Sequence, residues 1–236
     1  VQIWSDIDGF RNNDPRHVEN TATIRKMSYD EAAELAYFGA KIMHPASVHP
    51  ARKANIPLLL KNTLNPTDAG TLIHGNEKPE NIKAVAAKDH ISAIRIESGR
   101  MLNAYGFLKK IFSIFEKYQV PIDVITTSEV AVSVTIESQN LHHLMIDELQ
   151  MLGKVNVFDN QTVVCIVGDF GANRKSVLSA ILNNLTNVPL RMVSYGGNDI
   201  NISLVIDNKY KTLTLNNLQN LLINESYEQQ SMATVY

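Results

Sequence analysis

Blocks of hydrophobic and polar residues along the chain predict a protein that mixes helices and strands. In the first 75 residues, apolar runs predict strands at residues 1–4, 56–61 and 71–73. The second of these runs is almost wholly apolar, which is typical of a strand covered on both faces. Ser28 and Glu31 form a capping-box pattern that starts a helix, and Pro45 opens a shorter helix. The fold class predicted for this part is therefore α/β.

Beyond residue 81, predicted strands alternate with amphipathic helices. A polar segment around Pro79 predicts a linker over residues 76–81. The predicted strands are 82–87, 91–97, 122–127, 130–136, 155–158, 162–167, 190–195 and 200–206. The predicted helices are 104–118, 141–152, 174–185 and 210–223.

This second part contains an internal repeat. The segment VPIDVI at 120–125 matches VPLRMV at 188–193, and a polar turn and an alternating strand follow each copy. The pattern predicts two ferredoxin-like βαββαβ units. The second unit lacks a last strand and the first has one too many, so we expect the strand at 82–87 to complete the second unit. The predicted domains are 1–75, a first module at 90–158, a second module at 82–89 and 159–228 that encloses it, and a disordered tail at 229–236.

Composition and charge describe an ordinary soluble globular protein. Hydrophobic residues make up 44% and charged residues 19% of the chain, and the net charge is −2. This balance predicts no nucleic acid and no membrane as partner. The single cysteine, Cys165, lies in an apolar run and fits a buried position in a reducing cytoplasm. The chain starts inside an apolar run at Val1, so we expect an upstream part to be missing.

Two polar segments in the N-terminal part are candidates for a binding site. IWSDIDG at 3–9 leads into NDPR at 13–16, and FGAKIMHP occupies 38–45. Each segment follows the end of an element, where α/β proteins bind ligands. The cations Arg16 and Lys41 suit phosphate or an ion pair. The carboxylates Asp6 and Asp14 are also compatible with plain turn or cap positions, with Arg16 as the ion partner of one of them.

These motifs, followed by KNT at 61–63 and GTLI at 70–73, resemble the C-terminal third of the catalytic domain of aspartate kinases. The resemblance implies an amino-acid-kinase α/β sandwich that transfers the γ-phosphoryl group of ATP to L-aspartate with Mg²⁺. The nucleotide contacts that it implies are Ser5, Asp6, Arg16, Lys41 and Ile42, together with Arg11, where many family members have a tyrosine. The Lys-Phe-Gly-Gly-Thr-Ser segment that supplies the family's catalytic lysine is absent. We therefore expect no catalytic residue in this chain and no phosphorylation of aspartate by the chain alone.

A second constellation lies in the first module. Residues 101–108 form a loop that enters a helix, where backbone N–H groups favour an anion such as an α-carboxylate. Asp123 and Glu129 can receive ammonium groups. Together these groups suit an amino acid with an extra positive charge. The alternative from the residues alone is that Gly106 permits close packing, Phe107 belongs to the core and Asp123 is an exposed strand residue.

This constellation resembles the first ACT module of lysine-sensitive aspartate kinases. The resemblance implies that L-lysine binds as feedback effector between ACT modules of a homodimer in the cytoplasm. The implied contacts are Met101, Asn103, Ala104, Gly106, Phe107, Leu108, Ile122, Asp123, Thr127, Ser128 and Glu129. Asn103 and Ala104 stand where other members have histidine and serine. The alternative function is a stand-alone amino-acid-binding ACT regulatory protein without kinase activity.

Overall fold

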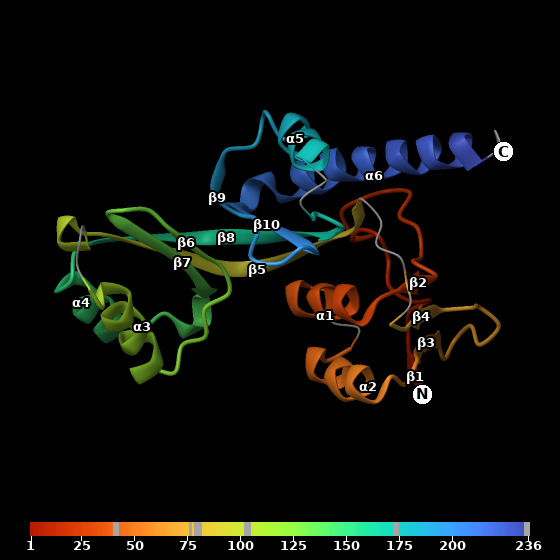
Figure 1. The fold of residues 1–236 in the computed structure, drawn as a ribbon, viewed down its shortest axis with the longest axis horizontal. Helices are drawn as coiled ribbons and strands as arrows, with labels where there is room; N and C mark the ends of the chain where they lie inside the picture. The colour runs from red at the N-terminus through yellow and green to blue at the C-terminus, as the bar shows by residue number, and fades with distance from the viewer. Residues whose placement is uncertain (40–42, 76, 78–81, 102–104, 172–174, 234–236) are drawn as a thin grey trace.

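The protein contains two β-sheets, one in the N-terminal part and one in the remainder of the chain (Figure 1). The computed structural model describes residues 1–39, 43–75, 77, 82–101, 105–171 and 175–233. The helices are α1 (Tyr29–Phe38), α2 (Val48–Ala54), α3 (Phe107–Lys117), α4 (His143–Gln150), α5 (Lys175–Asn184) and α6 (Lys211–Ala233). The strands are β1 (Gln2–Ser5), β2 (Lys26–Met27), β3 (Leu58–Asn62), β4 (Thr71–Ile73), β5 (Ile82–Glu97), β6 (Ile125–Thr127), β7 (Ala131–Glu137), β8 (Lys154–Gly168), β9 (Leu190–Ser194) and β10 (Asn201–Asp207). None of the helices in the described ranges is long and apolar enough to span a bilayer.

The small sheet has four strands in the order β1-β3-β4-β2. The strands β1 and β3 are parallel, and β3 and β4 are antiparallel. The predicted capping box is confirmed at the start of α1, since Ser28 N donates to Glu31 Oε2 at 2.7 Å and Glu31 N donates to Ser28 Oγ at 3.2 Å. The two-residue strand β2 lies directly before this box and was not predicted, because two residues are too few to show a period.

The large sheet has six strands in the order β6-β7-β5-β8-β10-β9. The prediction of separate strands at 82–87 and 91–97 is wrong, because both belong to the continuous strand β5. The strands predicted at 155–158 and 162–167 likewise form one strand, β8. Both strands bend where they leave one module and enter the other. At these bends His90 and Asn160 adopt left-handed backbone conformations with φ of 59° and 54°, and the pairing of β5 with β8 shifts register on both sides of Ile91.

The pairing of β5 with β8 agrees with a nested arrangement of the two modules. The first half of β5 pairs with residues 161–168 of β8, whose other neighbour is β10. The second half of β5 pairs with residues 154–158 of β8 and with β7. Each half of the sheet thereby has the strand order of a ferredoxin-like unit. The exact domain limits stay a prediction.

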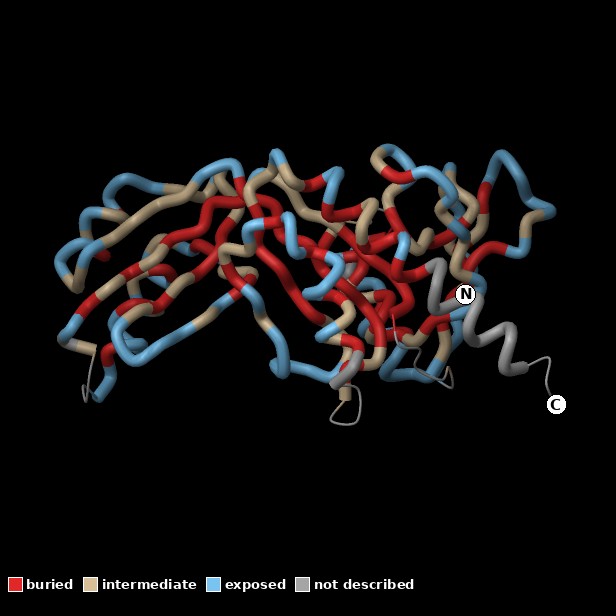
Figure 2. The backbone as a smooth tube through the Cα atoms, turned by 90° about the horizontal axis from the view of Figure 1, so that it is seen from above, coloured by how far each residue is buried: buried red, intermediate tan, exposed pale blue. Residues whose placement is uncertain are grey.

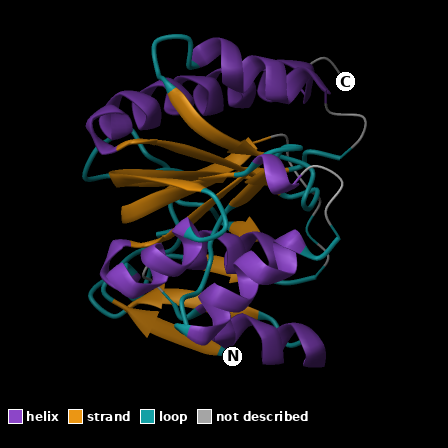
Figure 3. Ribbon diagram, turned by 90° about the vertical axis from the view of Figure 1, so that its left-hand side faces the viewer, coloured by secondary structure: helices purple, strands orange, loops and turns teal. Residues whose placement is uncertain are grey.

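Helices cover the large sheet on both sides (Figure 3). Alternate residues of β8 point to opposite faces: Val164 and Ile166 pack with α5 and α6, whereas Cys165 and Val167 belong to the core that includes α1. The helices α3 and α4 enclose a third core at the other end of the sheet. Most residues of β5 and the last eight residues of β8 are consequently buried, and Figure 2 shows buried segments running through the interior between exposed loops.

The helix α6 continues beyond its predicted end. A helix ending at residue 223 and a disordered tail from 229 were expected, but α6 reaches Ala233. Residues 211–233 contain neither glycine nor proline, and Glu225, Gln229 and Met232 are good helix formers. The helix thus overlaps the first part of the expected tail, and the disorder of residues 229–236 stays a prediction.

Candidate nucleotide and effector sites

The first predicted site begins where β1 and β3 end. Because these strands are parallel, their carboxyl ends meet at one edge of the small sheet. The Ser5 carbonyl accepts hydrogen bonds from Thr63 N at 2.8 Å and from Thr63 Oγ1 at 2.9 Å. Beyond it, Asp6 is exposed, and Asp8 accepts a 2.7 Å hydrogen bond from the buried Asn62. Ser5 and Asp6 therefore occupy a sheet edge of the kind that binds ligands in α/β proteins.

The two arginines of this predicted site have protein partners. Arg11 donates from Nη1 to the carbonyl and hydroxyl oxygens of Thr21 at 3.0 and 2.9 Å. Arg16 forms an ion pair with Asp14 at 2.7 Å, although its own side chain is 78% exposed. Burial raises the pKa of Asp14, but the hydrogen bonds from Arg16 outweigh burial and lower it below its ordinary value. The structure thus contains the local ion pair that the sequence left as an alternative.

The loop that carries Arg16 packs against the second module. Asn216 of α6 donates to the carbonyl of His17 at 3.3 Å, and the buried Asn13 donates to the carbonyl of Leu215 at 3.0 Å. This loop therefore connects the N-terminal part to α6. The other predicted nucleotide contacts, Lys41 and Ile42, lie outside the described residues.

The described residues contain no group of three or more His, Cys, Asp or Glu side chains placed to hold a metal ion. Mg²⁺ commonly keeps several water ligands and binds through one or two carboxylates together with the phosphates of a nucleotide. The donor set of the described chain is compatible with that mode of binding and offers no separate metal cage.

Two of the segments predicted to bind an amino acid meet at the end of β6, whereas Asp123 lies before its start, at the opposite end. Ser98 N donates to the Val130 carbonyl at 2.8 Å, and Met101 N donates to the Ser98 carbonyl at 3.1 Å. These bonds place the turn of Met101 beside the turn that follows β6. Thr127, the last residue of β6, is exposed, and so are Ser128, Glu129 and Val130 of that turn.

The start of α3 divides its residues between core and surface. Gly106 caps the helix in a left-handed conformation with φ of 76°. Phe107 is buried in the core of the first module, which agrees with the plainer interpretation of this residue, and Leu108 is exposed. Ile122 packs against the same core from the other side. Asn103 and Ala104 lie outside the described residues.

One interpretation of the sequence was that Asp123 is an exposed strand residue, and the structure does not agree with it. Its side chain is only 3% exposed. Its Oδ1 atom accepts hydrogen bonds from the Tyr37 hydroxyl at 2.6 Å and from Lys88 Nζ at 3.0 Å. Lys88 also lies 2.9 Å from Glu137. The sequence did not indicate Tyr37, Lys88 or Glu137 as functional residues, because they come from α1, β5 and β7 and share no local motif.

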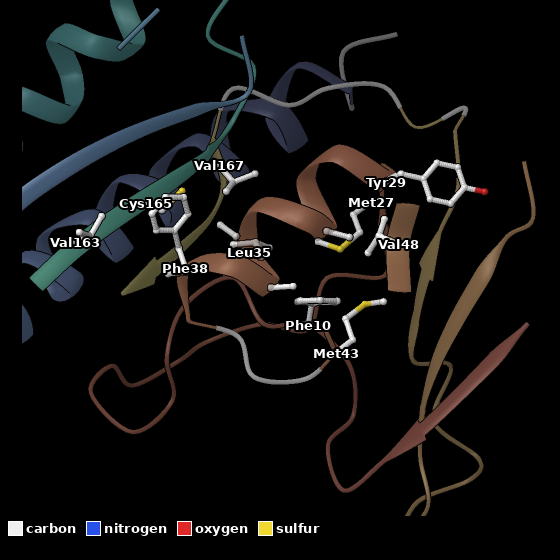
Figure 4. Close-up of a cluster of buried hydrophobic side chains, with 14 of the residues drawn as sticks. Phe10, Met27, Tyr29, Leu35, Phe38, Met43, Val48, Val163, Cys165 and Val167 are labelled. Carbon is white, nitrogen blue, oxygen red and sulfur yellow. The ribbon is translucent and has the colours of Figure 1, made fainter. Parts of the chain in front are cut away.

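Further contacts hold α1 against the large sheet. Glu31 pairs with Lys83 at 3.3 Å, and each of these side chains is 3% exposed. Glu34 accepts hydrogen bonds from Asn201 and from Asn198. Figure 4 shows the apolar part of this interface, where Leu35 and Phe38 of α1 lie next to β8.

Comparisons with known proteins agree with this architecture. Residues 1–62 match the model of the amino acid kinase family. The chain is 34% identical over 219 residues to chloroplastic aspartokinase 3 of Arabidopsis thaliana, an alignment that covers 88% of the chain and 39% of the relative. It is 39% identical to a chain described as a C-terminal regulatory domain of aspartate kinase from Porphyromonas gingivalis, with a TM-score of 0.53. That alignment covers 94% of the regulatory domain and 58% of this chain.

Solved structures of Escherichia coli aspartokinase III are similar over nearly the whole chain. The complex with aspartate and ADP, named the R-state, has a TM-score of 0.88 at 29% identity and covers 94% of this chain and 52% of that one. The complex with lysine and aspartate, named the T-state, has a TM-score of 0.83 at 30% identity and covers 94% and 51%. The chain thus spans about half the length of these proteins or less.

Proposed function

The chain belongs to the aspartokinase family, and on this premise we propose that it is the C-terminal part of an aspartate kinase that carries its own amino-acid sensor. One observation supports this proposal above the others. The segment that matches the amino acid kinase family leads through α1 onto a large sheet of two ferredoxin-like units, and α1 packs against that sheet. A stand-alone sensor has no need for a kinase segment packed in this way.

In the complete protein, ATP donates its γ-phosphoryl group to the β-carboxylate of L-aspartate. Phosphoryl transfer depends on positioning and on neutralising charge. The upstream part supplies the catalytic lysine, and this chain supplies one side of the nucleotide pocket. We place Mg²⁺ on the nucleotide phosphates.

The proposed nucleotide contacts start at the end of β1, where Ser5 and Asp6 meet the base and sugar. Arg16 approaches the phosphates by exchanging its partner Asp14 for a phosphate oxygen. The Arg16 side chain is free to turn because it is 78% exposed, and Asp14, which is 17% exposed, keeps the hydrogen bond from Arg16 N after the exchange. Lys41 and Ile42 complete the pocket, whereas Arg11 stabilises its own loop through Thr21.

We further propose that L-lysine is the effector of the first module and that two copies of this module form the effector site in a cytoplasmic homodimer. The start of α3, capped by Gly106, receives the α-carboxylate. Glu129 and Asp123, at opposite ends of the β6 segment, receive the ammonium groups. Thr127 and Ser128 add hydroxyl groups along the same strand.

The test is an assay of ATP-dependent aspartyl phosphate formation by the chain joined to its upstream coding sequence. The joined protein is expected to be active with Mg²⁺ and inhibited by L-lysine, whereas the 236-residue chain alone is inactive. Absence of activity at saturating ATP and Mg²⁺ would contradict the proposed reaction.

Effector choice is tested in the same protein with a variant of one carboxylate. Glu129→Gln should raise the lysine concentration needed for inhibition about tenfold or more, because a hydrogen bond to a charged group contributes roughly 1.5–3 kcal/mol. Glu116→Gln is the matched control, since Glu116 is an exposed carboxylate on α3. Threonine and methionine are titrated beside lysine, and inhibition by either of them alone would reassign the effector.

A further inference from the structure

Asp123 belongs to a cluster of side chains that joins the N-terminal part to the first module. Its Oδ1 atom accepts from Tyr37 of α1 and from Lys88 of β5. The Lys88 ammonium lies 4.8 Å from the centre of the Tyr37 ring and 2.9 Å from Glu137 of β7. Side chains of α1 and β5 therefore meet at the Asp123 carboxylate, and Lys88 links it to Glu137 of β7.

The second oxygen of this carboxylate, Oδ2, can still accept hydrogen bonds. Among the residues that the structure describes, Asp123 Oδ2 is buried and has no hydrogen-bond partner. Such an atom is unfavourable, because a buried acceptor loses its hydrogen bonds to water and gains none from the protein. The carboxylates of Asp123 and Glu137 lie 3.0 and 2.9 Å from the Lys88 ammonium, so a cation is already accepted at this position. The buried Oδ2 atom without a donor therefore suits one more cationic donor.

A ligand can reach Asp123 only if a neighbouring side chain moves. The Asp123 side chain is 3% exposed and that of Lys88 is 17% exposed, whereas Tyr37 is 43% exposed. Tyr37 is the outermost member of the cluster and the one whose displacement leaves the charges paired. Burial, followed by the hydrogen bond to Asp123, raises the pKa of Tyr37 above its ordinary value, so the hydroxyl remains a protonated donor at neutral pH.

Tyr37 lies near the end of α1, directly before the predicted nucleotide segment. Glu31, Glu34 and Tyr37 follow one another at intervals of one helical turn, and all three bond to the large sheet. After Phe38 the chain passes close to β5 at Gly39 and enters the segment that contains Lys41. Release of Tyr37 would therefore loosen the end of α1 that leads into this segment.

We propose that the Tyr37 hydroxyl and a cationic effector compete for the Asp123 carboxylate, so that effector binding undocks the end of α1 from the sensor. This inference rests on the proposed function, because it takes L-lysine as the effector. In the form described, Asp123 is bonded to Tyr37 and α1 is docked. The greater similarity of this form to the aspartate and ADP complex than to the lysine complex of the Escherichia coli enzyme agrees with an effector-free arrangement.

If Tyr37 competes with the effector, removing its hydroxyl should strengthen lysine binding. Removing a group that contacts the effector would weaken it. Tyr37→Phe removes only the competing hydroxyl, so calorimetric titration of the 236-residue chain should give a Kd for L-lysine about tenfold lower than that of the unmodified chain. Hydrogen exchange should show faster exchange over residues 29–38 of the unmodified chain when lysine is bound. The Tyr37→Phe variant should show this faster exchange without lysine.

The chain offers a closely matched control. Tyr118 donates to Glu148 at 2.8 Å beside Lys117, a tyrosine–carboxylate–lysine cluster that lies within the first module. Tyr118→Phe should leave both the Kd and the exchange of α1 unchanged. The proposed competition is wrong if Tyr37→Phe binds lysine no more tightly than the unmodified chain, or if lysine leaves the hydrogen exchange of α1 unaltered. Neither result would contradict the proposed effector site. If the unmodified chain binds no lysine, the proposed effector itself is wrong.

Discussion

At the scale of single residues, the buried ion pair between Lys83 and Glu31 makes the stability of the chain sensitive to the loss of either partner. Each side chain is 3% exposed, so neither charge is solvated if the other is removed. Lys83→Ala should lower the free energy of unfolding by about 3–5 kcal/mol, because it leaves the Glu31 carboxylate buried without its cation. Urea unfolding of the chain measures this change.

The comparison for this prediction is a pair on the exposed side of the same helix. Arg52 pairs with Asp30, and their side chains are 56% and 43% exposed. Arg52→Ala should change the free energy of unfolding by no more than about 1 kcal/mol. Equal losses of unfolding free energy in Lys83→Ala and Arg52→Ala would show that burial does not control the strength of these ion pairs.

At the scale of elements, Gly39 determines how α1 ends. It has φ of 147°, and a Cβ atom built there would lie 2.4 Å from the Ala87 carbonyl oxygen of β5. Gly39→Ala therefore has to strain the backbone and push α1 away from the sheet, which should cost roughly 1–3 kcal/mol of unfolding free energy. Thermal and urea unfolding measure the loss.

Gly197 provides the control for that substitution. A Cβ atom built at Gly197 meets nothing within 4 Å. Gly197→Ala should accordingly change stability by less than about 0.5 kcal/mol. If Gly39→Ala is equally mild, the close approach of α1 to β5 is not needed for stability.

Elements with a strong local signal could be predicted from the sequence. The capping box at Ser28 indicated the start of α1, and the repeated segments at 120–125 and 188–193 indicated two similar units. The continuity of β5 could not be predicted in this way, because polar residues at its bend resemble a loop. They remain in the strand because the bend lies where one module passes into the next and His90 accepts a left-handed conformation.

The candidate sites show the same limit. The pairing of Arg16 with Asp14 was foreseeable as an alternative, because the two residues are close in sequence. The partners of Asp123 were not foreseeable, because Tyr37 reaches it only through the docking of α1 and Lys88 reaches it from another strand of the folded sheet. Such contacts are formed by tertiary packing, which no local sequence pattern predicts.

At the scale of the whole molecule, Cys165 can report whether the N-terminal part is docked. It is the single cysteine of the chain, it is buried, and it belongs to the core shared by α1 and β8. Burial raises the pKa of its thiol, which lowers its reactivity further. A disulfide reagent such as DTNB should therefore label the folded chain far more slowly than the unfolded chain.

Two phenylalanine variants separate local undocking from general loss of stability. Phe38→Ala opens the core around Cys165, whereas Phe115→Ala opens the core of the first module, and each should cost about 3–5 kcal/mol. Under native conditions, labelling should be faster in Phe38→Ala than in Phe115→Ala. Equal rates would mean that Cys165 is exposed only when the whole chain unfolds.

The two long shared strands also determine how this molecule can be dissected. A shortened chain that starts at residue 90 would retain every strand of the first module but would remove the partner of residues 161–168 and leave that edge open to aggregation. Removing the first module instead should disturb the remaining sheet less. Lys88 and Val163 are directly paired on antiparallel strands, so a short hairpin could join them. In chain order, residues 91–158 lie between the paired strand segments 82–88 and 163–168, so the predicted first module could be removed as a unit, whereas the second depends on residues on both sides of it.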